Sequence, residues 1–408
     1  MASTINTNIA SINAQRNLGL SASSLATSMQ RLSSGLRVNS AKDDAAGLAI
    51  AERMNTQVKG LTVASRNAND GISLAQTAEG ALGKMGDMLQ RMRELAVQSS
   101  NATNSNADRE ALQAEVKQLT QEIDRVAKQT TFNGQKILDG SFVGAVFQVG
   151  ANSGDNVTLG ALADTRTSGL ASVQYGEFIT ATLDASGATA GTLDSLGALT
   201  SGGTFSIQVG TATAIDLGDL KAASSGAERL GQVVAAINAK SSDTGVTAFV
   251  TRNDTTGAYT VDLKSSKLDA AGAPELITFG AGFGLAATGL AVGNEPVAII
   301  AADKGIDTLT VDTQADAWVS LKKIDSAIDQ INSARADLGA LQSRFESAVA
   351  NIDIQIENVA AARGRIVDAD FAKETANLSR TQILQQAGTA MVAQANQLPQ
   401  NVLKLLQG

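Results

Sequence analysis

The sequence predicts a mixed α and β protein: a long α-helical coiled coil or bundle formed by both termini, with an inserted β-rich (α+β) central outer region. Two observations predict this architecture. Apolar residues recur at steps of three and four along both ends of the chain, which is the period of an amphipathic helix. The middle is rich in glycine and threonine, and its apolar and polar residues alternate as in strands. Because helices flank the middle, the two ends of the chain must come together.

The composition also favours slender helices over one thick core. Aromatic residues make up only 3% of the 408 residues, although 43% are hydrophobic. A chain of this length has room for roughly two to four domains of about 150 residues each.

Residues 1–42 form the first predicted element, an N-terminal helical arm. Residues 369–408 form a matching C-terminal arm. The apolar positions of the two arms are Leu18, Leu25, Met29, Leu32 and Leu36, and Leu384, Met391, Leu398, Val402 and Leu405. Their polar faces consist of Ser, Thr, Asn and Gln, whereas a helix facing water normally carries Glu and Lys. We expect both arms to be mobile in the monomer and to order when buried among copies of the chain.

Two alternative roles for the arms stay open. The arms could form an intramolecular hairpin that seals the open end of the bundle. They could also lie on a membrane surface, but such a helix would place Lys or Arg on one face and aromatics on the other. No apolar run approaches the roughly 20 residues of a membrane span. The start, MASTINTNIASINAQ, lacks the basic and apolar regions of a secretory signal, so we expect no membrane insertion.

Residues 43–175 are the predicted N-terminal part of a helical rod, reached through a charged joint that contains Asp43 and Asp44. Two neighbouring apolar seams in its first long helix indicate packing on two sides. Gly80, Gly83 and Gly86 interrupt that helix, and we expect them to allow a close approach by another helix. After a polar loop and a third helix, the period changes at FNG, which predicts a hairpin region with short strands in KILDGSF and AVFQVG.

Residues 176–309 are the predicted outer β-rich region. Strands are expected in TFSIQVG, TAFVTR and AYTVDL, and one helix in AERLGQVVAAINAK. Residues 176–307 contain 7 basic and 14 acidic residues, a net of −7 out of −8 for the whole chain. We therefore expect a solvated outer module. Residues 310–368 return to the rod as one long helix, and a second polar joint, VDADFAKETANLS, leads into the C-terminal arm.

The residue types exclude most chemistry. The chain has no cysteine and no histidine, so it lacks thiols, disulfides and the usual general base and metal ligand. There is no phosphate-binding loop and no dinucleotide fingerprint. The net charge of −8 without a basic cluster argues against nucleic acid. We expect no enzyme, no cofactor, no metal site and no catalytic residue. Glycan binding by the middle would have only Trp318 and two tyrosines for stacking.

Long segments at both ends resemble bacterial flagellins. RLSSGLRVNSAKDDAAGLAIAERM, LQRMRELAVQSSNATNSNADREALQAE and TTFNGQKIL resemble the N-terminal region of that family. ADFAKETANLSRTQILQQAGTAMVAQANQLPQNVLKLLQ resembles its C-terminus. The resemblance covers Ala2–Gly150 and Thr313–Leu406. In the middle, GTFSIQVG followed by VVAAINAKSSDTGVTAFV is similar to a small β–α module of some flagellins and hook-associated proteins.

The resemblance implies a subunit of the extracellular bacterial flagellar filament, which serves swimming motility. It implies a helical homopolymer assembled through the terminal arms, with the middle projecting outward. It also implies export of the unfolded chain by the flagellar type III export apparatus without a cleaved signal peptide. Further implied partners are an export chaperone at the C-terminal arm and the hook-associated and cap proteins. A hook–filament junction protein of the same superfamily is the alternative.

Two host-receptor surfaces are implied as well. Gln30–Ala51 resembles the peptide sensed by the flagellin receptor kinase of plants, in which Asp43, Asp44 and Gly47 match the motif. The departures from its common form are Leu36, Val38 and Ala49. The patch bound by the Toll-like flagellin receptor of vertebrates is matched by Arg91, Leu95 and Glu115. A structural role is the alternative for each: the aspartates can cap a helix start, and the others can be ordinary helix residues.

Overall fold

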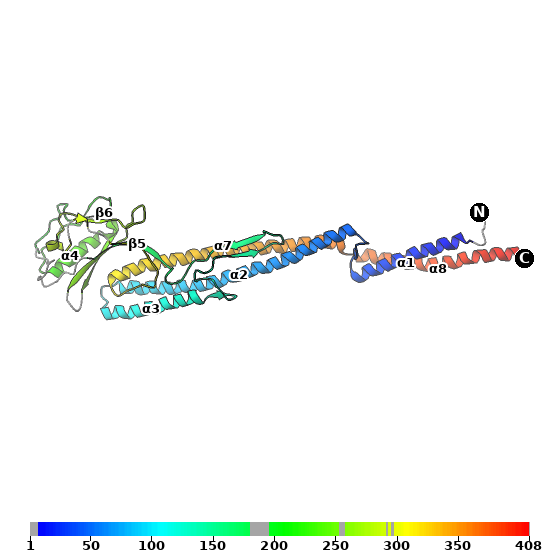
Figure 1. The fold of residues 1–408 in the computed structure, drawn as a ribbon, viewed down its shortest axis with the longest axis horizontal. Helices are drawn as coiled ribbons and strands as arrows, with labels where there is room; N and C mark the ends of the chain where they lie inside the picture. The colour runs from blue at the N-terminus through cyan, green and yellow to red at the C-terminus, as the bar shows by residue number, and fades with distance from the viewer. Residues whose placement is uncertain (1–6, 180–195, 253–257, 291–292, 295–297, 408) are drawn as a thin grey trace. The chain divides into compact units, whose positions relative to one another are not determined.

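The computed structural model describes residues 7–179, 196–252, 258–290, 293–294 and 298–407. It gives the backbone alone for residues 179, 285, 293–294, 298–302 and 398–407. The chain divides into two compact units. The first consists of Met1–Ile72, Val146–Thr158 and Arg344–Gly408, and the second of Ser73–Ala145 and Leu159–Ser343. Two long helices, α2 (Ala45–Ser99) and α7 (Gln314–Val367), contribute to both (Figure 1).

In the first unit, the two arms form an antiparallel helix pair. Helix α1 (Ile9–Ser34) packs along α8 (Phe371–Gln407), drawn in blue and red in Figure 1. The Asn8 side chain caps α1 by accepting from the Ser11 backbone N–H at 3.1 Å. Gly35 ends α1 at a φ of +72°, a left-handed conformation that glycine adopts without steric cost.

The two joints are hydrogen-bonded to each other in what we call the base clasp, residues 35–38 and 366–369. The Arg37 backbone N–H donates to the Val367 carbonyl at 2.7 Å, and the Ala369 N–H donates to the Gly35 carbonyl at 2.9 Å. The Arg37 guanidinium also donates to the Ile366 carbonyl at 2.5 Å. The clasp therefore joins the segment after α1 to the end of α7 and to the junction between α7 and α8 through short antiparallel pairing.

Close helix approaches in α2 occur at glycines other than those expected. A Cβ at Gly60 would lie 3.1 Å from the Ala151 Cβ, and one at Gly71 would lie 2.7 Å from the Phe345 ring. The expectation for Gly80, Gly83 and Gly86 is wrong: among the described residues, nothing lies within 4 Å of a Cβ at these positions. The reason is their phase on the helix, because the buried seam there runs through other residues, namely Ala78, Leu82, Met85 and Leu89.

In the second unit, the later part of α2 and the earlier part of α7 pack with α3 (Asn106–Gln129). Ser105 and Asp108 form a capping box at the start of α3. Strands β1 (Thr131–Phe132) and β2 (Gln135–Lys136) then form a hairpin. Its turn residues, Asn133 and Gly134, have φ values of +48° and +79°, as a two-residue type I′ turn requires.

One expected strand in this region is absent from the described structure. KILDGSF is not a strand beyond Lys136, where β2 ends. The Leu138 carbonyl instead accepts from the backbone and hydroxyl of Thr165, at 3.0 and 2.9 Å. A loop thus takes the hydrogen bond that a ladder would have used. AVFQVG does contain a strand, β3 (Ala145–Gln148), which pairs with β4 (Asn156–Leu159).

The outer region contains two four-stranded sheets and the expected helix, α4 (Gly226–Ala239). One sheet has the order β12-β5-β9-β8, with strands Ala298–Lys304, Ser172–Ile179, Tyr259–Ser265 and Val246–Arg252. The other has the order β11-β10-β6-β7, with strands Gly293–Asn294, Ile277–Phe279, Ser206–Val209 and Ile215–Asp216. Short helices α5 (Ser241–Thr244) and α6 (Leu285–Thr288) complete it. The three expected strands, β6, β8 and β9, are confirmed.

The outer region has a hydrophobic core of its own. Its largest buried side chains include Phe205, Phe279 and Phe283, and the rings of the first and third lie 4.5 Å apart. Helix α4 packs on β8 and contributes Val233 and Ile237 to this core. Strand β5 begins at Ser172. It therefore crosses the boundary between rod and outer region that we expect between residues 175 and 176.

Strands β5 and β12 are attached to α7 by polar and aromatic contacts. The Tyr175 and Trp318 rings meet edge to face at 6.3 Å. The Lys323 ammonium, on a side chain only 3% exposed, lies 2.7 Å from a carboxylate oxygen of Asp303. Burial and nearby carboxylates raise the pKa of the Tyr175 hydroxyl, so it stays protonated. The outer region therefore leaves the rod through a packed contact rather than a bare linker.

Candidate assembly surface

The face on which α1 and α8 meet combines leucines of α1 with small and polar side chains. On both helices, the buried and half-buried positions recur at steps of three and four. They include Ser11, Ala14, Leu18, Ser21, Leu25, Ser28 and Leu32 on α1, and Glu374, Leu378, Thr381, Gln385, Gly388, Val392 and Ala395 on α8. We call these positions the inward seam. The helices approach closely at Gly388, where a Cβ would lie 3.0 Å from a methyl carbon of Leu18.

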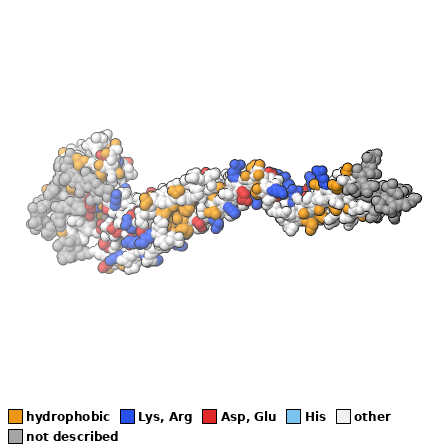
Figure 2. All heavy atoms as spheres, turned by 45° about the vertical axis from the view of Figure 1, so that its right-hand side comes forward, with side chains coloured by type: hydrophobic (Ala, Val, Ile, Leu, Met, Phe, Trp, Pro, Cys, Tyr) orange, Lys and Arg blue, Asp and Glu red, His pale blue; other side chains and the backbone are white. Residues whose placement is uncertain are grey.

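Several larger apolar side chains stay on the outside of the pair. Leu384 is 50% exposed and Met391 is 63% exposed on α8, while Met29 is 56% exposed on α1. Other outward apolar residues of the arms are Ile9, Ile12, Leu20, Phe371 and Ile383. Together these eight residues form the outward stripe. Figure 2 shows orange side chains between white ones on the arms, beside the grey terminal residues.

The apolar positions expected from the sequence are therefore split between two faces. Leu18, Leu25 and Leu32 lie on the inward seam, and Leu36 joins the base clasp through a bridge to Asp368. Met29, Leu384 and Met391 face outward. The side chains of Leu398, Val402 and Leu405 lie outside the described residues, although their backbone continues α8. The seam on α8 gives little hydrophobic signal in the sequence, because Thr381, Gln385 and Gly388 are not apolar.

The first joint is ordered by its two aspartates. Asp43 Oδ2 accepts from the Ser40 backbone N–H and hydroxyl, both at 2.9 Å. These hydrogen bonds hold the pKa of the exposed Asp43 carboxyl below its ordinary value of 3.8. Asp44 caps α2 by accepting from the Gly47 N–H at 2.8 Å. A Cβ at Gly47 would lie 2.3 Å from an Asp44 carboxylate oxygen, so a larger residue there would displace the capping carboxylate from this position.

Arg91, Leu95 and Glu115 lie at the meeting of α2 and α3, but only two of them are at the surface. Arg91 donates to Glu115 at 2.9 Å across the two helices and to Glu94 at 2.9 Å within α2. Leu95 is 1% exposed and belongs to the core. The exposed ion pair joins the helices at the surface, while Leu95 packs inside.

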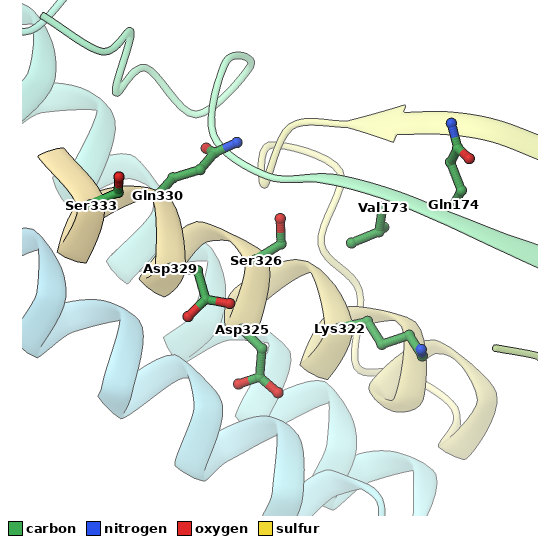
Figure 3. A pocket seen from close by; sticks show the side chains of 8 residues that line it. All are labelled: Val173, Gln174, Lys322, Asp325, Ser326, Asp329, Gln330 and Ser333. Carbon is green, nitrogen blue, oxygen red and sulfur yellow. The ribbon is translucent and has the colours of Figure 1, made fainter. Parts of the chain in front are cut away.

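The groove beside α7 does not form a reactive site. It is lined by Val173, Gln174, Lys322, Asp325, Ser326, Asp329, Gln330 and Ser333. Figure 3 shows these side chains pointing in different directions instead of converging on one point. The Lys322 ammonium lies over the Trp318 ring, 4.9 Å from its centre, and Asp325 accepts from Arg93 at 2.6 Å. Both charges are therefore engaged in contacts with their neighbours.

No helix among the described residues is both long and apolar enough to cross a membrane. Within the same part of the chain, no group of three or more His, Cys, Asp and Glu side chains is arranged to hold a metal ion.

Known proteins match the chain at both ends and over its full length. The model of the bacterial flagellin N-terminal helical region matches residues 5–143, and that of the C-terminal helical region matches residues 321–406. Flagellin C of Vibrio cholerae is 41% identical over 408 residues, covering 100% of both chains. The chain belongs to the bacterial flagellin family.

Two other flagellins are similar over 100% of both chains. The B-type flagellin of Pseudomonas aeruginosa is 37% identical over an alignment of 506 positions. The flagellin of Salmonella choleraesuis is 38% identical over 517 positions. Like them, this flagellin is a structural subunit of the flagellar filament. The filament lies outside the cell and is built from many copies of its subunit. The junction-protein alternative gains nothing over the filament subunit from these matches.

Proposed function

We propose that this flagellin polymerises through the outward stripe of its two terminal helices, which neighbouring copies bury in the filament. The supporting observation is that Leu384 and Met391 remain at least half exposed even though α1 packs along α8. Burying apolar surface contributes about 25 cal/mol per Å². A head-to-tail interface that does not close then extends into an open helical polymer.

An intramolecular hairpin alone accounts poorly for this arrangement. A hairpin that served only to seal the bundle would leave few large apolar residues outside, but this pair encloses only some of them, among which are Leu18, Leu25 and Leu32 of α1. Here the inward seam of α8 has Thr381, Gln385 and Gly388, while Leu384 and Met391 face away. The apolar surface is thus positioned for a contact outside the pair.

Substitutions in the outward stripe test this proposal. The double variant Leu384→Gln and Met391→Gln keeps helix propensity but removes apolar surface. We expect it to lengthen the lag of seeded polymerisation and to lower the yield of filaments in electron micrographs by about tenfold or more. The matched control, Leu384→Met with Met391→Leu, keeps the apolar surface and should polymerise like the parent. Equal filament yield from both double variants would overturn the proposal.

The arms also suggest how the chain is exported before it assembles. Apart from Leu18, Leu25 and Leu32 of α1, their inward seam is mostly small and polar, so the pair is expected to be held weakly before assembly. We infer that the arms order on assembly and that the type III export apparatus passes the chain unfolded. An export chaperone would cover the C-terminal arm until then, and hook-associated and cap proteins would meet the ends of the filament.

The domain boundaries are part of the same proposal. Residues 1–42 and 369–408 would form the inner arms, and residues 43–175 and 310–368 the rod. Residues 176–309 would form the outer region. The end of α1 at Ser34, the start of α2 at Ala45 and the break between Val367 and Phe371 support the two inner boundaries.

Host receptors would meet surfaces that have structural roles. Asp43, Asp44 and Gly47 order the first joint, and we infer that a plant receptor would read this segment. Arg91 and Glu115 present an exposed ion pair that a Toll-like receptor could contact. Leu95 would act beneath them by packing, because its side chain is buried.

A further inference from the structure

An ion pair lies between the two arms near the base clasp. Arg31 Nη1 lies 4.0 Å from Glu374 Oε1, and the two side chains are 31% and 9% exposed. They line a polar cavity of about 400 Å³ with a second cation, Arg380 of α8, and with Ser23, Ser24, Thr27, Ser28, Asn377 and Thr381. In sequence, Glu374 is the single acidic residue of Phe371–Gln407, and Ile9–Ser34 contains none. A pairing of opposite charges between these helices therefore has few alternatives.

The inward seam by itself defines the register of the arms poorly. On α1, Leu18, Leu25 and Leu32 follow each other at intervals of seven, and Ala14, Ser21 and Ser28 do the same. On α8, Thr381, Gly388 and Ala395 are also seven apart, and all three are small. A shift of one heptad would replace the contacts at these positions with ones of similar size. Repetitive seams of this kind need a polar feature to select one alignment.

The ion pair supplies such a feature, because it is lost in either shifted alignment. In the observed register, Leu18 faces Gly388 and Arg31 faces Glu374. A shift that brings Leu18 to Ala395 would place Arg31 near Arg380. The opposite shift would place Glu374 near Ser24. The second shift leaves the largely buried Glu374 carboxylate without its cation, which is unfavourable. The first shift brings two arginines together and moves Glu374 past the end of α1.

We propose that the Arg31–Glu374 ion pair selects the register in which the two arms of one chain pair. The selected register also fixes which outward apolar residues of α1 lie level with those of α8. The base clasp follows the same alignment through the bridge between Leu36 and Asp368. The test must therefore change the ion pair while leaving the clasp residues intact.

Disulfide trapping can read the register directly, because the chain contains no cysteine. A Cβ at Gly388 would lie 3.7 Å from the Leu18 Cβ, within the roughly 3.5–4.5 Å of a disulfide. Leu18→Cys with Gly388→Cys therefore reports the observed register. Leu18→Cys with Thr381→Cys, or with Ala395→Cys, reports a shift of one heptad in either direction. Filaments of the full chain are oxidised and dissolved, and linked peptides are mapped by mass spectrometry.

Charge variants complete the test in each cysteine background. With the parental ion pair, the Leu18–Gly388 link should exceed either shifted link by about tenfold or more. Arg31→Glu and Glu374→Arg alone should each raise the shifted links, and the two together should restore the parental ratio. Arg31→Gln with Glu374→Gln removes the ion pair without leaving an uncompensated charge, and it should also raise the shifted links. This neutral double variant keeps the test valid if a single charge variant fails to fold.

Each contrary result has a definite meaning. If all charge variants keep the Leu18–Gly388 link dominant, other contacts set the register, such as the base clasp or the 2.7 Å hydrogen bond from Ser11 to Asn396, and the proposal is wrong. If links form mainly between chains and migrate as dimers, the arms do not pair within one chain, which also overturns it. Neither result depends on the outward stripe, so the polymerisation proposal would stand or fall separately.

Discussion

Single side chains at the first joint combine structural and electrostatic roles. Asp43 closes a turn onto Ser40, and Asp44 caps α2 onto Gly47. The sequence suggests both a receptor motif and a cap here, and the described geometry shows the cap. A partner that reads this segment would recognise a surface already ordered by these hydrogen bonds.

The Asp43 turn should weaken in acid. The pKa of Asp43 in the folded state lies below the ordinary value of 3.8. The stabilisation that its carboxylate gives the turn is therefore present above pH 3.8 and is lost as the pH falls through the lower folded-state pKa. We expect hydrogen exchange of the Ser40 amide, corrected for intrinsic rate, to quicken in that acidic window. Asp43→Asn accepts hydrogen bonds but does not titrate, so its corrected exchange should change little there. Parallel curves for parent and variant would contradict this assignment.

Helix α2 shows how one element can hold glycines with opposite roles. Gly71 lies against the Phe345 ring, which itself meets the Phe147 ring edge to face at 5.3 Å. Gly83 has open space around it among the described residues. The sequence shows only that both interrupt a helical pattern, because the ring that approaches Gly71 comes from a segment more than 270 positions away.

Alanine at these two positions should change stability in opposite directions. Gly71→Ala puts a methyl group 2.7 Å from the Phe345 ring, so ring or helix must shift, at about 1–3 kcal/mol. Gly83→Ala meets no such neighbour and should stabilise the helix by about 1 kcal/mol through propensity alone. Chemical denaturation followed by circular dichroism measures both. A neutral Gly71→Ala would mean that the ring and the helix can separate at little cost.

The two arms show that a sequence pattern can predict a helix without predicting which face of it makes contact. The helical period of α1 and α8 is evident from the sequence, and both form long helices. On α8 the face on which they meet is not evident from the sequence, because Thr, Gln and Gly occupy much of it. An apolar stripe normally marks the buried side of a helix, but in a chain that assembles it can mark the side left for a partner.

At the scale of the whole molecule, the outer region of this flagellin is an insertion whose two ends lie next to each other. The first and last strand residues of the connection, Ser172 and Lys304, are direct partners in the β5–β12 ladder. Antiparallel partners lie about 5 Å apart, so the chain leaves and re-enters the rod at nearly one point. The outer region can thus vary in length without moving the segments that flank it.

Deleting the outer region should therefore spare assembly. A variant lacking residues 173–303, closed by a Gly-Gly linker between Ser172 and Lys304, keeps both arms and the outward stripe. We expect it to form filaments in electron micrographs and to lose one unfolding transition in calorimetry. A matched variant lacking Met1–Leu36 and Thr381–Gly408 should keep the outer transition and form no filaments. Filament loss on deleting 173–303 would show that the outer region is needed for polymerisation.

The linear pattern of residues is sufficient for the family, the helical ends and the inserted β-rich region. Period, composition and long motifs are local properties, so they can be recognised without knowing which residues are in contact. Only packing decided that Gly71 rather than Gly83 meets a ring, that Leu95 is buried, and that Leu384 and Met391 face outward. Each of these depends on which segment from the other end of the chain lies opposite. Long-range pairing has no signature in a sequence read one window at a time.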